Sequence, residues 1–303
     1  MIDRSDLLTW QGLRNLATCE AFNLADGIAI IPPKPGRPPI ILESPGMRRK
    51  GPSVWMHLPN RIEPEPGGIL YARDGWRSPW RGQIAALPVP IVLITAFHDR
   101  AILPAATAEL FAGSVQTWYG VQVQTTHPQL VPMPVGVDNR QLPWLQEAQR
   151  QETRDILLYL NFQLGARHHE VNLLREYLWR YFSARPWVVA DPWAKACYSH
   201  YYAQLGRSRF VLSPPGYGWD CYRTYDAIAM GAIPIVQRKR PTTDVCESLP
   251  VLVVDTWDEV TEERLASEWE KRRSDAPSLS MTYWRDRIRG SARAIRTSTS
   301  CAS

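Results

Sequence analysis

The stretch 209–237 reads RFVLSPPGYGWDCYRTYDAIAMGAIPIVQ, with an apolar segment at each end, a glycine-containing loop and a helical pattern between them. The apolar segments, 209–215 and 232–237, have the length and character of buried parallel strands. Residues 220–230 carry apolar side chains at helical spacing. The order strand, helix, strand predicts a unit whose two strands are parallel and joined by a right-handed crossover.

The same alternation continues on both sides of this stretch through the C-terminal half of the chain. Each apolar run is followed by a segment with helical spacing, as in 168–182, where apolar residues recur every three or four positions. Alternating strands and helices are typical of an α/β fold with a parallel sheet. The predicted strands are 155–162, 186–191, 209–215, 232–237 and 250–255, and the predicted helices are 168–182, 194–208, 220–230 and 257–273.

The N-terminal half contains shorter apolar runs between turn signals. The strongest run, 89–95, is continuous and rich in β-branched residues, which predicts a buried parallel strand. Residues 105–113 follow it with the composition of a short helix. Further strands are predicted at 29–31, 54–56, 69–71 and 130–137.

The polar segment 142–154 lacks strand character, and we interpret it as a linker. Two α/β halves joined by a linker would leave a cleft between them. The sequence therefore predicts an α/β protein with two Rossmann-like domains that face a cleft, residues 1–150 and 151–278. Residues 279–303 follow as a C-terminal helix and tail.

Composition places the 303-residue chain among soluble globular proteins, with 45% hydrophobic and 21% charged residues. The net charge of +5 suits an anionic small molecule as well as a nucleic acid. We find no recognition helix, no RNA-binding aromatic motif and no basic tail, so we do not expect nucleic acid as a partner. No apolar stretch reaches the roughly 18 residues of a membrane-spanning helix, so no membrane span is expected.

The five cysteines are far apart in the sequence and form no CxxC pair. Their spacing argues against a zinc site and against a disulfide framework. The first residues of the chain hold no apolar signal core. These two features together predict a reducing, cytoplasmic location.

The loop and helix of 213–230 concentrate side chains that suit a phosphorylated ligand. Gly216 and Gly218 allow close approach of the backbone, and free N–H groups at a helix N-terminus favour a phosphate. Asp220 stands where a helix N-cap belongs, Arg223 could grip a phosphate with its guanidinium fork, and Asp226 could accept both hydroxyls of a ribose. A structural interpretation is open as well: a tight turn, a capping Asp220, and an ion pair between Arg223 and Asp226.

From about residue 157 to residue 258 the chain resembles the exostosin-like glycosyltransferases. The matching blocks are LLYLNFQLGARHHEVN, LGRSRFVLSPPGYGWDCYRTYDAIAMGAIPIV and LPVLVVDTWDEVTEE, of which the middle one is the most specific. The N-terminal half resembles the family more loosely, through IVLITAFHD and HPQLVPMPVGVDN. The resemblance implies the GT-B arrangement of two Rossmann-like domains, with a last helix that crosses back onto the first domain.

The resemblance also implies a function for each domain. Residues 151–278 would bind a nucleotide sugar and residues 1–150 a carbohydrate acceptor, in a transfer that inverts the anomeric centre during glycan or polysaccharide synthesis. The predicted donor-binding residues are Asn161, Arg167, Ser213, Gly216, Tyr217, Gly218, Asp220, Arg223 and Asp226. The chain departs from the family pattern at Pro215, where relatives commonly have arginine, and at Asp226, where they have glutamate. Tyr217 also replaces a residue that is often small or polar, so the donor's identity is left open.

Sugar transfer requires stabilisation of a departing diphosphate, which arginines and backbone dipoles can supply without a metal. Metal-dependent glycosyltransferases usually carry an Asp-x-Asp pair, and this sequence has none. We therefore expect no metal, and no cofactor other than the nucleotide sugar as donor substrate. Arg167, in the loop after the strand 155–162, would add a second positive charge beside Arg223; alternatively it is a solvated arginine at a helix start.

Inversion in a single displacement requires a base that removes the proton of the acceptor hydroxyl. Asp99 is the first candidate, because it ends the strongest strand and the C-terminal ends of parallel strands open on the cleft. His98 and His127 follow, since imidazoles titrate near neutral pH. Structural interpretations are open for all three: a helix cap for Asp99 and hydrogen-bonded loop residues for the histidines.

Three functions are compatible with the sequence. The first is an active glycosyltransferase, the second a catalytically silent GT-B partner subunit that keeps the fold, and the third a basic module that binds polyanions. Turnover of a nucleotide sugar would support the first, and binding without turnover the second. A steep salt dependence of nucleic-acid affinity would support the third.

Overall fold

The contacts within the computed structural model divide the chain into two compact units. Unit 1 comprises Met1–Thr9 and Pro134–Met281, and unit 2 comprises Trp10–Met133 and Thr282–Ser303. The structure describes residues 3–16, 19–24, 27–30, 40–42, 66–72, 80–96, 101–165, 169–192, 197–271 and 275–300.

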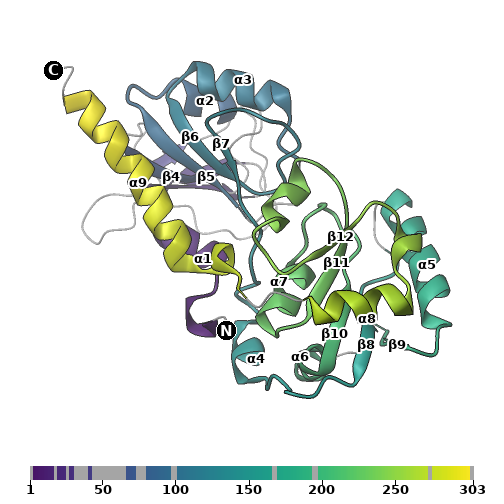
Figure 1. The fold of residues 1–303 in the computed structure, drawn as a ribbon. Helices are drawn as coiled ribbons and strands as arrows, with labels where there is room; N and C mark the ends of the chain where they lie inside the picture. Colours follow the sequence, from purple (N-terminus) through teal and green to yellow (C-terminus); the bar gives the residue numbers. More distant parts are fainter. Residues whose placement is uncertain are drawn as a thin grey trace, which may run out of the picture. The chain divides into compact units, whose positions relative to one another are not determined.

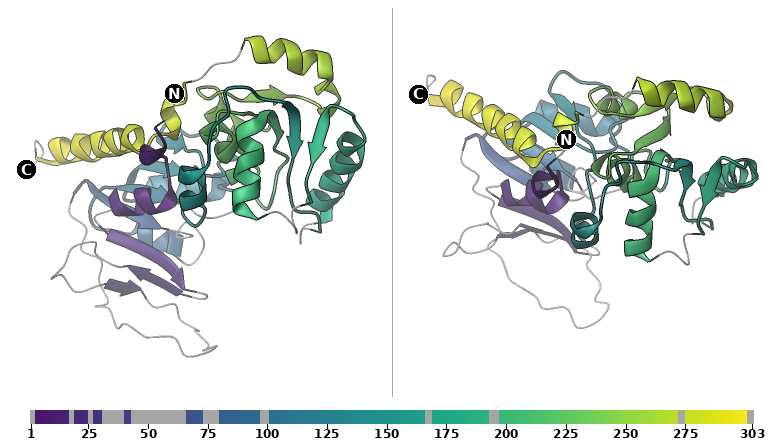
Figure 2. Two further views of the ribbon diagram at one scale, coloured as in Figure 1. Left: turned by 90° about the horizontal axis from the view of Figure 1, so that it is seen from below. Right: turned by 60° about the horizontal axis from the view of Figure 1, so that its bottom comes forward.

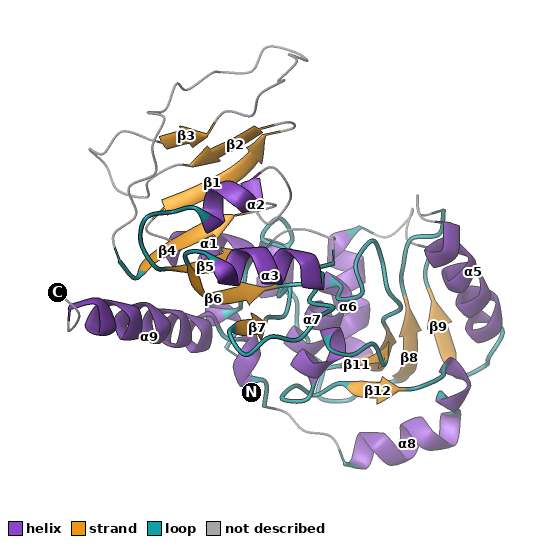
Figure 3. Ribbon diagram, turned by 90° about the horizontal axis from the view of Figure 1, so that it is seen from above, coloured by secondary structure: helices purple, strands orange, loops and turns teal. Residues whose placement is uncertain are grey.

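Unit 1 is built on a five-stranded sheet in which every strand is parallel to its neighbours, in the order β12-β11-β10-β8-β9 (Figures 1 and 3). The parallel sheet predicted for the C-terminal half of the sequence is therefore confirmed. The strands are β8 (Ile156–Leu160), β9 (Val188–Ala190), β10 (Ser208–Leu212), β11 (Ile233–Gln237) and β12 (Leu252–Val254).

Helices cover both faces of this sheet, and the alternation of side chains along β8 shows why. Leu158 and Leu160 face a core completed by Leu178 of α5 and Leu265 of α8. Tyr159, between them, points to the opposite face, where its ring lies 6.5 Å from that of Tyr201 on α6. The helices of unit 1 are α4 (Leu142–Glu147), α5 (His169–Ser183), α6 (Tyr198–Arg207), α7 (Tyr222–Ala229) and α8 (Glu262–Glu270).

Unit 2 contains a seven-stranded sheet of mixed direction, in the order β3-β2-β1-β4-β5-β6-β7 (Figures 2 and 3). The neighbouring strands β1, β4, β5, β6 and β7 run parallel to one another. At the β1 edge the sheet continues with β2 and β3, and the pairs β1–β2 and β2–β3 are antiparallel. The strands are β1 (Cys19–Leu24), β2 (Gly27–Ile30), β3 (Ile40–Leu42), β4 (Gly68–Ala72), β5 (Ile91–Thr95), β6 (Val115–Gly120) and β7 (Leu130–Pro132). The antiparallel extension is an addition that the predicted Rossmann-like domain did not include.

The buried strand predicted at 89–95 is β5, whose five residues are all buried. Its neighbour β6 was not predicted, because the sequence VQTWYG has the polar pair Gln116 and Thr117 at its centre and is not a continuous apolar run. Trp118 of β6 is nevertheless fully buried, and its indole N–H donates to the Thr95 hydroxyl at 2.9 Å. The run predicted at 54–56 lies outside the described residues.

Helix α9 (Met281–Ser300) groups with unit 2 and contacts its sheet at Tyr119 of β6. The Tyr119 hydroxyl lies 2.8 Å from the Ser291 hydroxyl and donates to the Arg287 carbonyl at 3.2 Å. The remaining helices of unit 2 are α1 (Trp10–Leu16), α2 (Trp80–Ala85) and α3 (Pro104–Ala112). No helix in the described ranges has both the length and the apolar character needed to cross a bilayer.

The segment 142–154 is an anchored part of unit 1. The sequence predicted a domain boundary near residue 150, whereas in the structure the boundary between the units falls between Met133 and Pro134. Leu145 of α4 is fully buried. Arg150 donates to the Ala229 carbonyl and Arg154 to the Met230 carbonyl, both at the end of α7. Arg150 and Arg154 thus bind the carbonyls at the end of a helix, so the interpretation of 142–154 as a linker is wrong.

Candidate functional site

The candidate site lies in unit 1, at the point where the strand order of the sheet reverses. β9 lies on one side of β8, and β10 lies on the other. The loops after β8 and β10 therefore leave the sheet in opposite directions, which in open α/β sheets creates a ligand-binding crevice at the carboxyl ends of the strands. Residues 161–165 and 213–221 form these two loops.

Arg223, from the first turn of α7, bridges the two loops. Its Nε donates to the carbonyl of Asn161 at 2.7 Å, and its Nη1 lies 3.4 Å from the carbonyl of Pro214. Both acceptors are neutral backbone groups, so the positive charge of Arg223 is held at the reversal point without being neutralised.

A second guanidinium, that of Arg175 on α5, lies beside the same loops. It is 6% exposed, and it donates from Nε to the Pro215 carbonyl at 2.9 Å and from Nη1 to the Gln163 carbonyl at 3.0 Å. The sequence prediction missed this residue. A signal was present, because Arg175 interrupts the apolar face that Val171, Leu178 and Phe182 form on the predicted helix.

The ring of Phe162 contacts both guanidinium groups. The guanidinium carbons of Arg175 and Arg223 lie 6.0 and 5.5 Å from its centroid, the range of cation–π contacts. No ion pair joins either arginine to a carboxylate within the part of the chain that the structure describes. Burial, and to a smaller extent Arg223, lowers the pKa of Arg175 to about 10, so the Arg175 guanidinium stays charged at neutral pH.

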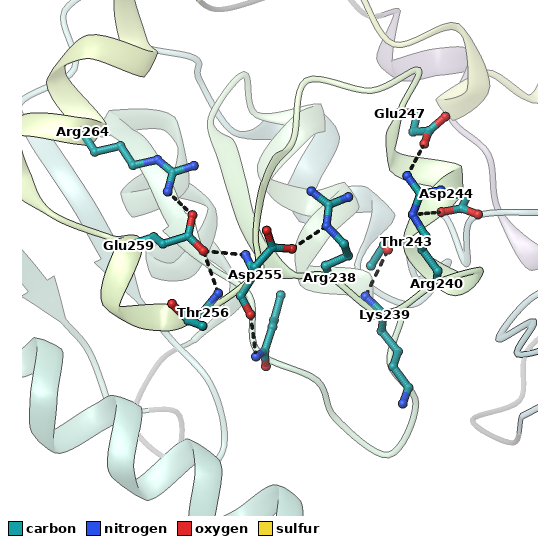
Figure 4. A network of polar contacts seen from close by, with 11 residues as sticks. Arg238, Lys239, Arg240, Thr243, Asp244, Glu247, Asp255, Thr256, Glu259 and Arg264 are labelled. Atoms are coloured by element: carbon teal, nitrogen blue, oxygen red, sulfur yellow. Dashed lines mark hydrogen bonds and ion pairs between the residues drawn. The ribbon is translucent and has the colours of Figure 1, made fainter.

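The basic cluster 238–240, three consecutive cations in the sequence, differs from this arginine pair. Arg238 pairs with Asp255 at 2.6 Å, and Arg240 lies within 3.6 Å of Asp244 and 3.4 Å of Glu247 (Figure 4). Nearby, Arg264 pairs with Glu259. One buried and one half-buried cation without carboxylate partners are the stronger indication of an anionic ligand, since surface ion pairs of this kind are common and weak.

The glycine loop is closed by a tight turn in which the Gly216 N–H donates to the Gly218 carbonyl at 2.9 Å. A Cβ at Gly216 would lie 3.0 Å from Nη2 of Arg175, so glycine lets the loop approach the guanidinium closely. Tyr217, between the two glycines, is 47% exposed. Ser213, at the start of the loop, is buried, and its hydroxyl lies 2.9 Å from that of Thr224 on α7.

Asp220 does not cap a helix, so this part of the sequence interpretation is wrong. α7 begins at Tyr222, with Cys221 as an N-cap whose side chain makes no capping bond. The Asp220 carboxylate instead accepts from the Val135 N–H at 2.9 Å and from the Tyr225 hydroxyl at 2.8 Å. Burial raises the pKa of Asp220 to about 7 despite these bonds.

Asp226 is 2% exposed, and two tyrosines of α6 donate to its carboxylate. The hydroxyls of Tyr201 and Tyr202 lie 3.3 and 3.2 Å from its two oxygens. The alternative of a solvated ion pair with Arg223 is therefore wrong. The predicted contact with a ribose would require these tyrosines to release the carboxylate. Burial raises the pKa of Asp226 to about 7, although both hydrogen bonds oppose the rise.

This raised pKa predicts a specific pH dependence of stability. Because the folded pKa exceeds the unfolded value, the folded state keeps a proton between about pH 4 and pH 7 that the unfolded chain releases. Stability from this group is therefore present below about pH 4 and is lost as the pH rises to about 7. Asp226→Asn removes the ionisation, so its free energy of unfolding relative to the wild type should rise by about 2–4 kcal/mol across that window. Urea unfolding at a series of pH values measures the difference.

Asp155→Asn is the matched control for this measurement, because the exposed Asp155 pairs with Arg207 and its pKa is lowered, not raised. The free energy of unfolding of Asp155→Asn relative to the wild type should fall as the pH rises, which is opposite in sign to the change expected for Asp226→Asn. A pH-independent difference between Asp226→Asn and the wild type would show that Asp226 is ionised throughout.

Asn161 directly follows β8 and is fully buried. Its Nδ2 donates to the Tyr159 hydroxyl at 3.1 Å, which in turn donates to Asp191 at 3.0 Å. Asp191 also lies 2.8 Å from Nε2 of His200. The side-chain Oδ1 of Asn161 is buried and accepts no hydrogen bond from any described residue, which leaves a polar atom of the site unsatisfied.

Three residues that the sequence selected fall outside the described residues: Arg167, His98 and Asp99. The third base candidate, His127, is described. Its ring stacks on Phe111 with centroids 4.1 Å apart, and its Nδ1 accepts from the Gln129 N–H at 3.2 Å. A neutral imidazole whose Nδ1 accepts carries its proton on Nε2 and has no lone pair left for a substrate proton. This geometry argues against His127 as the base.

Comparison with known proteins gives one family match and several remote structural ones. Two solved structures are similar to the chain at 12% identity and a TM-score of 0.35. They are the pneumococcal O-GlcNAc transferase GtfA in complex with UDP and GlcNAc, and the GtfA/B complex. The similarity covers 77% and 76% of this chain but only 54% and 55% of those chains, so this chain spans about half their length. The comparison with curated proteins found no match.

The family match is confined to unit 1. Residues 183–265 match the model of the RXYLT1 C-terminal domain. The matched range contains the glycine loop and Arg223, whereas Asn161 and Arg175 precede it. The segment of this chain that is similar to the RXYLT1 C-terminal domain is thus the one that carries β10, the loop after it and α7.

Proposed function

We propose that the protein is an inverting glycosyltransferase that moves a sugar from a nucleotide-diphosphate donor to a carbohydrate hydroxyl, in glycan or polysaccharide synthesis. The observation that carries this proposal is the pair of guanidiniums, Arg175 and Arg223, held without carboxylate partners at the strand-order reversal. Two adjacent cations at that position suit a diphosphate, because each guanidinium presents a planar fork that matches phosphate oxygens.

The family match supports the assignment. The RXYLT1 C-terminal domain comes from an exostosin-related xylosyltransferase, and the resemblance noted from the sequence is to the exostosin-like family. The matched range includes Arg223 and the loop that contacts Arg175. We further propose a GT-B arrangement, with unit 1 as the donor domain, unit 2 as the acceptor domain and α9 as the helix that returns to unit 2.

In the proposed reaction an acceptor hydroxyl oxygen attacks the anomeric carbon while the bond from that carbon to the donor phosphate breaks. The electron pair passes to the leaving diphosphate, and the base takes the hydroxyl proton. Arg175 and Arg223 stabilise the charge that grows on the diphosphate, and their fixed positions avoid reorganisation during the reaction. The backbone of Gly216 and Gly218 lines the same anion, and Tyr217 lies at the mouth of the site.

The structure suggests a positioning function for two acids that the sequence placed on the ligand. Asp220 joins the loop to Val135 and Tyr225, and Asp226 joins α7 to α6 through Tyr201 and Tyr202. Both therefore fix the helix from which Arg223 projects. Contact of Asp226 with a ribose hydroxyl remains a proposal that requires movement of the two tyrosines.

A catalytically silent partner subunit is the second candidate function. Two observations favour it: Pro215 stands where relatives commonly have arginine, and the Asp226 carboxylate is engaged by protein hydroxyls. Such a subunit would bind the nucleotide without turning over a nucleotide sugar. Binding of nucleic acid is not favoured, because Arg238 and Arg240, two of the three cations of the cluster 238–240, are paired with acids (Figure 4). A cytoplasmic location is part of the proposal.

The proposal predicts release of a nucleoside diphosphate from at least one nucleotide sugar, by transfer or by slow hydrolysis. Because the arginine pair supplies the charge and the sequence has no Asp-x-Asp pair, the rate should be unchanged in excess chelator. A coupled assay over a panel of nucleotide sugars, after a thermal-shift screen for binding, makes the measurement. Binding without release would favour the silent subunit. Loss of activity on chelation, restored by manganese or magnesium, would show that a carboxylate site for a metal exists.

A further inference from the structure

The outer face of α5 carries an apolar stripe that runs from solvent to the edge of the core of unit 1, against which Tyr181 packs. Leu173, Tyr177 and Tyr181 stand at positions i, i+4 and i+8 and therefore share one face of the helix. The first two are 52% and 50% exposed. The opposite face carries Leu178 and Phe182, both fully buried in the core of unit 1. An outward face of a surface helix is usually polar, so this stripe requires a separate explanation.

The stripe is ordered by its own contacts. The rings of Tyr177 and Tyr181 stack with centroids 5.8 Å apart and an interplanar angle of 22°. The guanidinium of Arg185 lies 4.7 Å from the centroid of the Tyr181 ring, within the range of a cation–π contact. An open depression of about 400 Å³ on this face is lined by Leu173, Glu176, Tyr177, Arg180 and Tyr181. Preordered aromatic side chains around a depression are typical of a contact surface, because little side-chain entropy remains to be lost on binding.

The apolar stripe carries one acid and one base, Glu176 and Arg180, so that two copies of this face can be complementary in charge. Glu176 and Arg180 are four residues apart, in the order that favours an ion pair within a helix. The structure nevertheless forms no ion pair between them, and Arg180 pairs with no other carboxylate among the described residues. The Glu176 carboxylate accepts instead from Asn172 at 2.7 Å and stays on the surface. One acid and one base are therefore placed one turn apart on the same apolar face.

We propose that this face binds a second copy of the same chain, with two α5 helices antiparallel about a two-fold axis. In a two-fold arrangement each residue i that contacts j is matched by j contacting i. If the two-fold axis crosses α5 at the height midway between residues 176 and 180, Glu176 of each copy lies opposite Arg180 of the other. This makes two equivalent ion pairs. The tyrosine stacks of the two copies fill the space between these pairs. A single helix face gives a small interface, so the dimer should be weak and depend on protein concentration.

Charge reversal tests this arrangement directly. Sedimentation velocity of the wild-type chain from 5 to 500 µM (roughly the range for a weak dimer) should show a monomer–dimer equilibrium. Glu176→Arg and Arg180→Glu each place like charges at both contacts, so each variant should raise the dissociation constant at least tenfold. When the two variants are mixed, every contact again joins an acid to a base, and a heterodimer should form with an affinity near that of the wild type.

Glu262→Arg on α8 is the matched control, since it makes the same charge reversal outside the stripe and should leave the dimer unchanged. Circular dichroism and thermal unfolding of each variant establish that it is folded. A wild-type chain that stays monomeric up to 500 µM would overturn the proposal. So would a dimer that both single variants leave intact, or a mixture of the two variants that forms no heterodimer.

Discussion

Asp99→Asn is expected to lower the turnover of the proposed transfer by about a hundredfold to ten-thousandfold, the usual range for loss of a general base. Asparagine keeps the size and hydrogen bonding of the side chain but cannot accept the proton of the acceptor hydroxyl. Asp99 follows β5 in the sequence, and the C-terminal ends of parallel strands are where such sheets place their reactive groups. Steady-state kinetics with a nucleotide sugar that the wild type uses give the measurement.

Donor affinity separates a lost base from a disturbed site. In Asp99→Asn the dissociation constant of the nucleoside diphosphate should stay close to the wild-type value, because the proposed diphosphate contacts come from unit 1. His98→Gln and His127→Gln are the matched controls. His127→Gln should retain most activity, since Nδ1 of His127 already accepts from Gln129. Wild-type turnover in Asp99→Asn, with loss in His98→Gln, would transfer the assignment to His98.

Arg223→Ala is expected to weaken nucleoside-diphosphate binding by roughly 1.5–3 kcal/mol, about tenfold to 150-fold. The guanidinium of Arg223 is bonded to backbone carbonyls and leaves its charge for a ligand. Titration calorimetry with uridine diphosphate, guanosine diphosphate and inorganic pyrophosphate makes the measurement. The affinity for all three should fall by a similar factor, since the lost contact is to the phosphates and not to the base.

Arg223→Lys keeps a positive charge without the planar fork and should show an intermediate loss. Arg238→Ala is the control for general electrostatics, because Arg238 is exposed and paired with Asp255. Its affinity for the same ligands should be close to that of the wild type. Arg175 is a less suitable first target, because it is buried and its removal would also disturb the packing around Phe162. Unchanged pyrophosphate affinity in Arg223→Ala would remove its proposed contact with the phosphates.

The sequence by itself determined the parallel sheet of unit 1, because each of its strands is an apolar run and the central strands β8, β10 and β11 are largely buried on both faces. It also selected the loop after β10 and Arg223, since glycines, prolines and an arginine stand out between two apolar segments. It was less informative for unit 2, where the adjacent Trp118 and Tyr119 are both buried in a strand that also carries polar residues. The antiparallel extension by β2 and β3 depends on pairing between strands, which no local pattern encodes.

Only the tertiary structure decided which charges stand alone and which are paired. In the sequence Arg238 and Arg240 look like a basic patch, and Asp226 and Arg223 look like an ion pair. In the fold Arg238 pairs with Asp255, directly after β12, and Arg240 with Asp244 and Glu247, which follow β11. Two tyrosines of α6 donate to Asp226. It also turns Arg175 from the middle of a helix toward the glycine loop. The partners of Arg240 are close in the sequence, whereas those of Arg238, Asp226 and Arg175 come from distant segments. For these three side chains the pairing follows from the packing of the whole unit and not from neighbours along the chain.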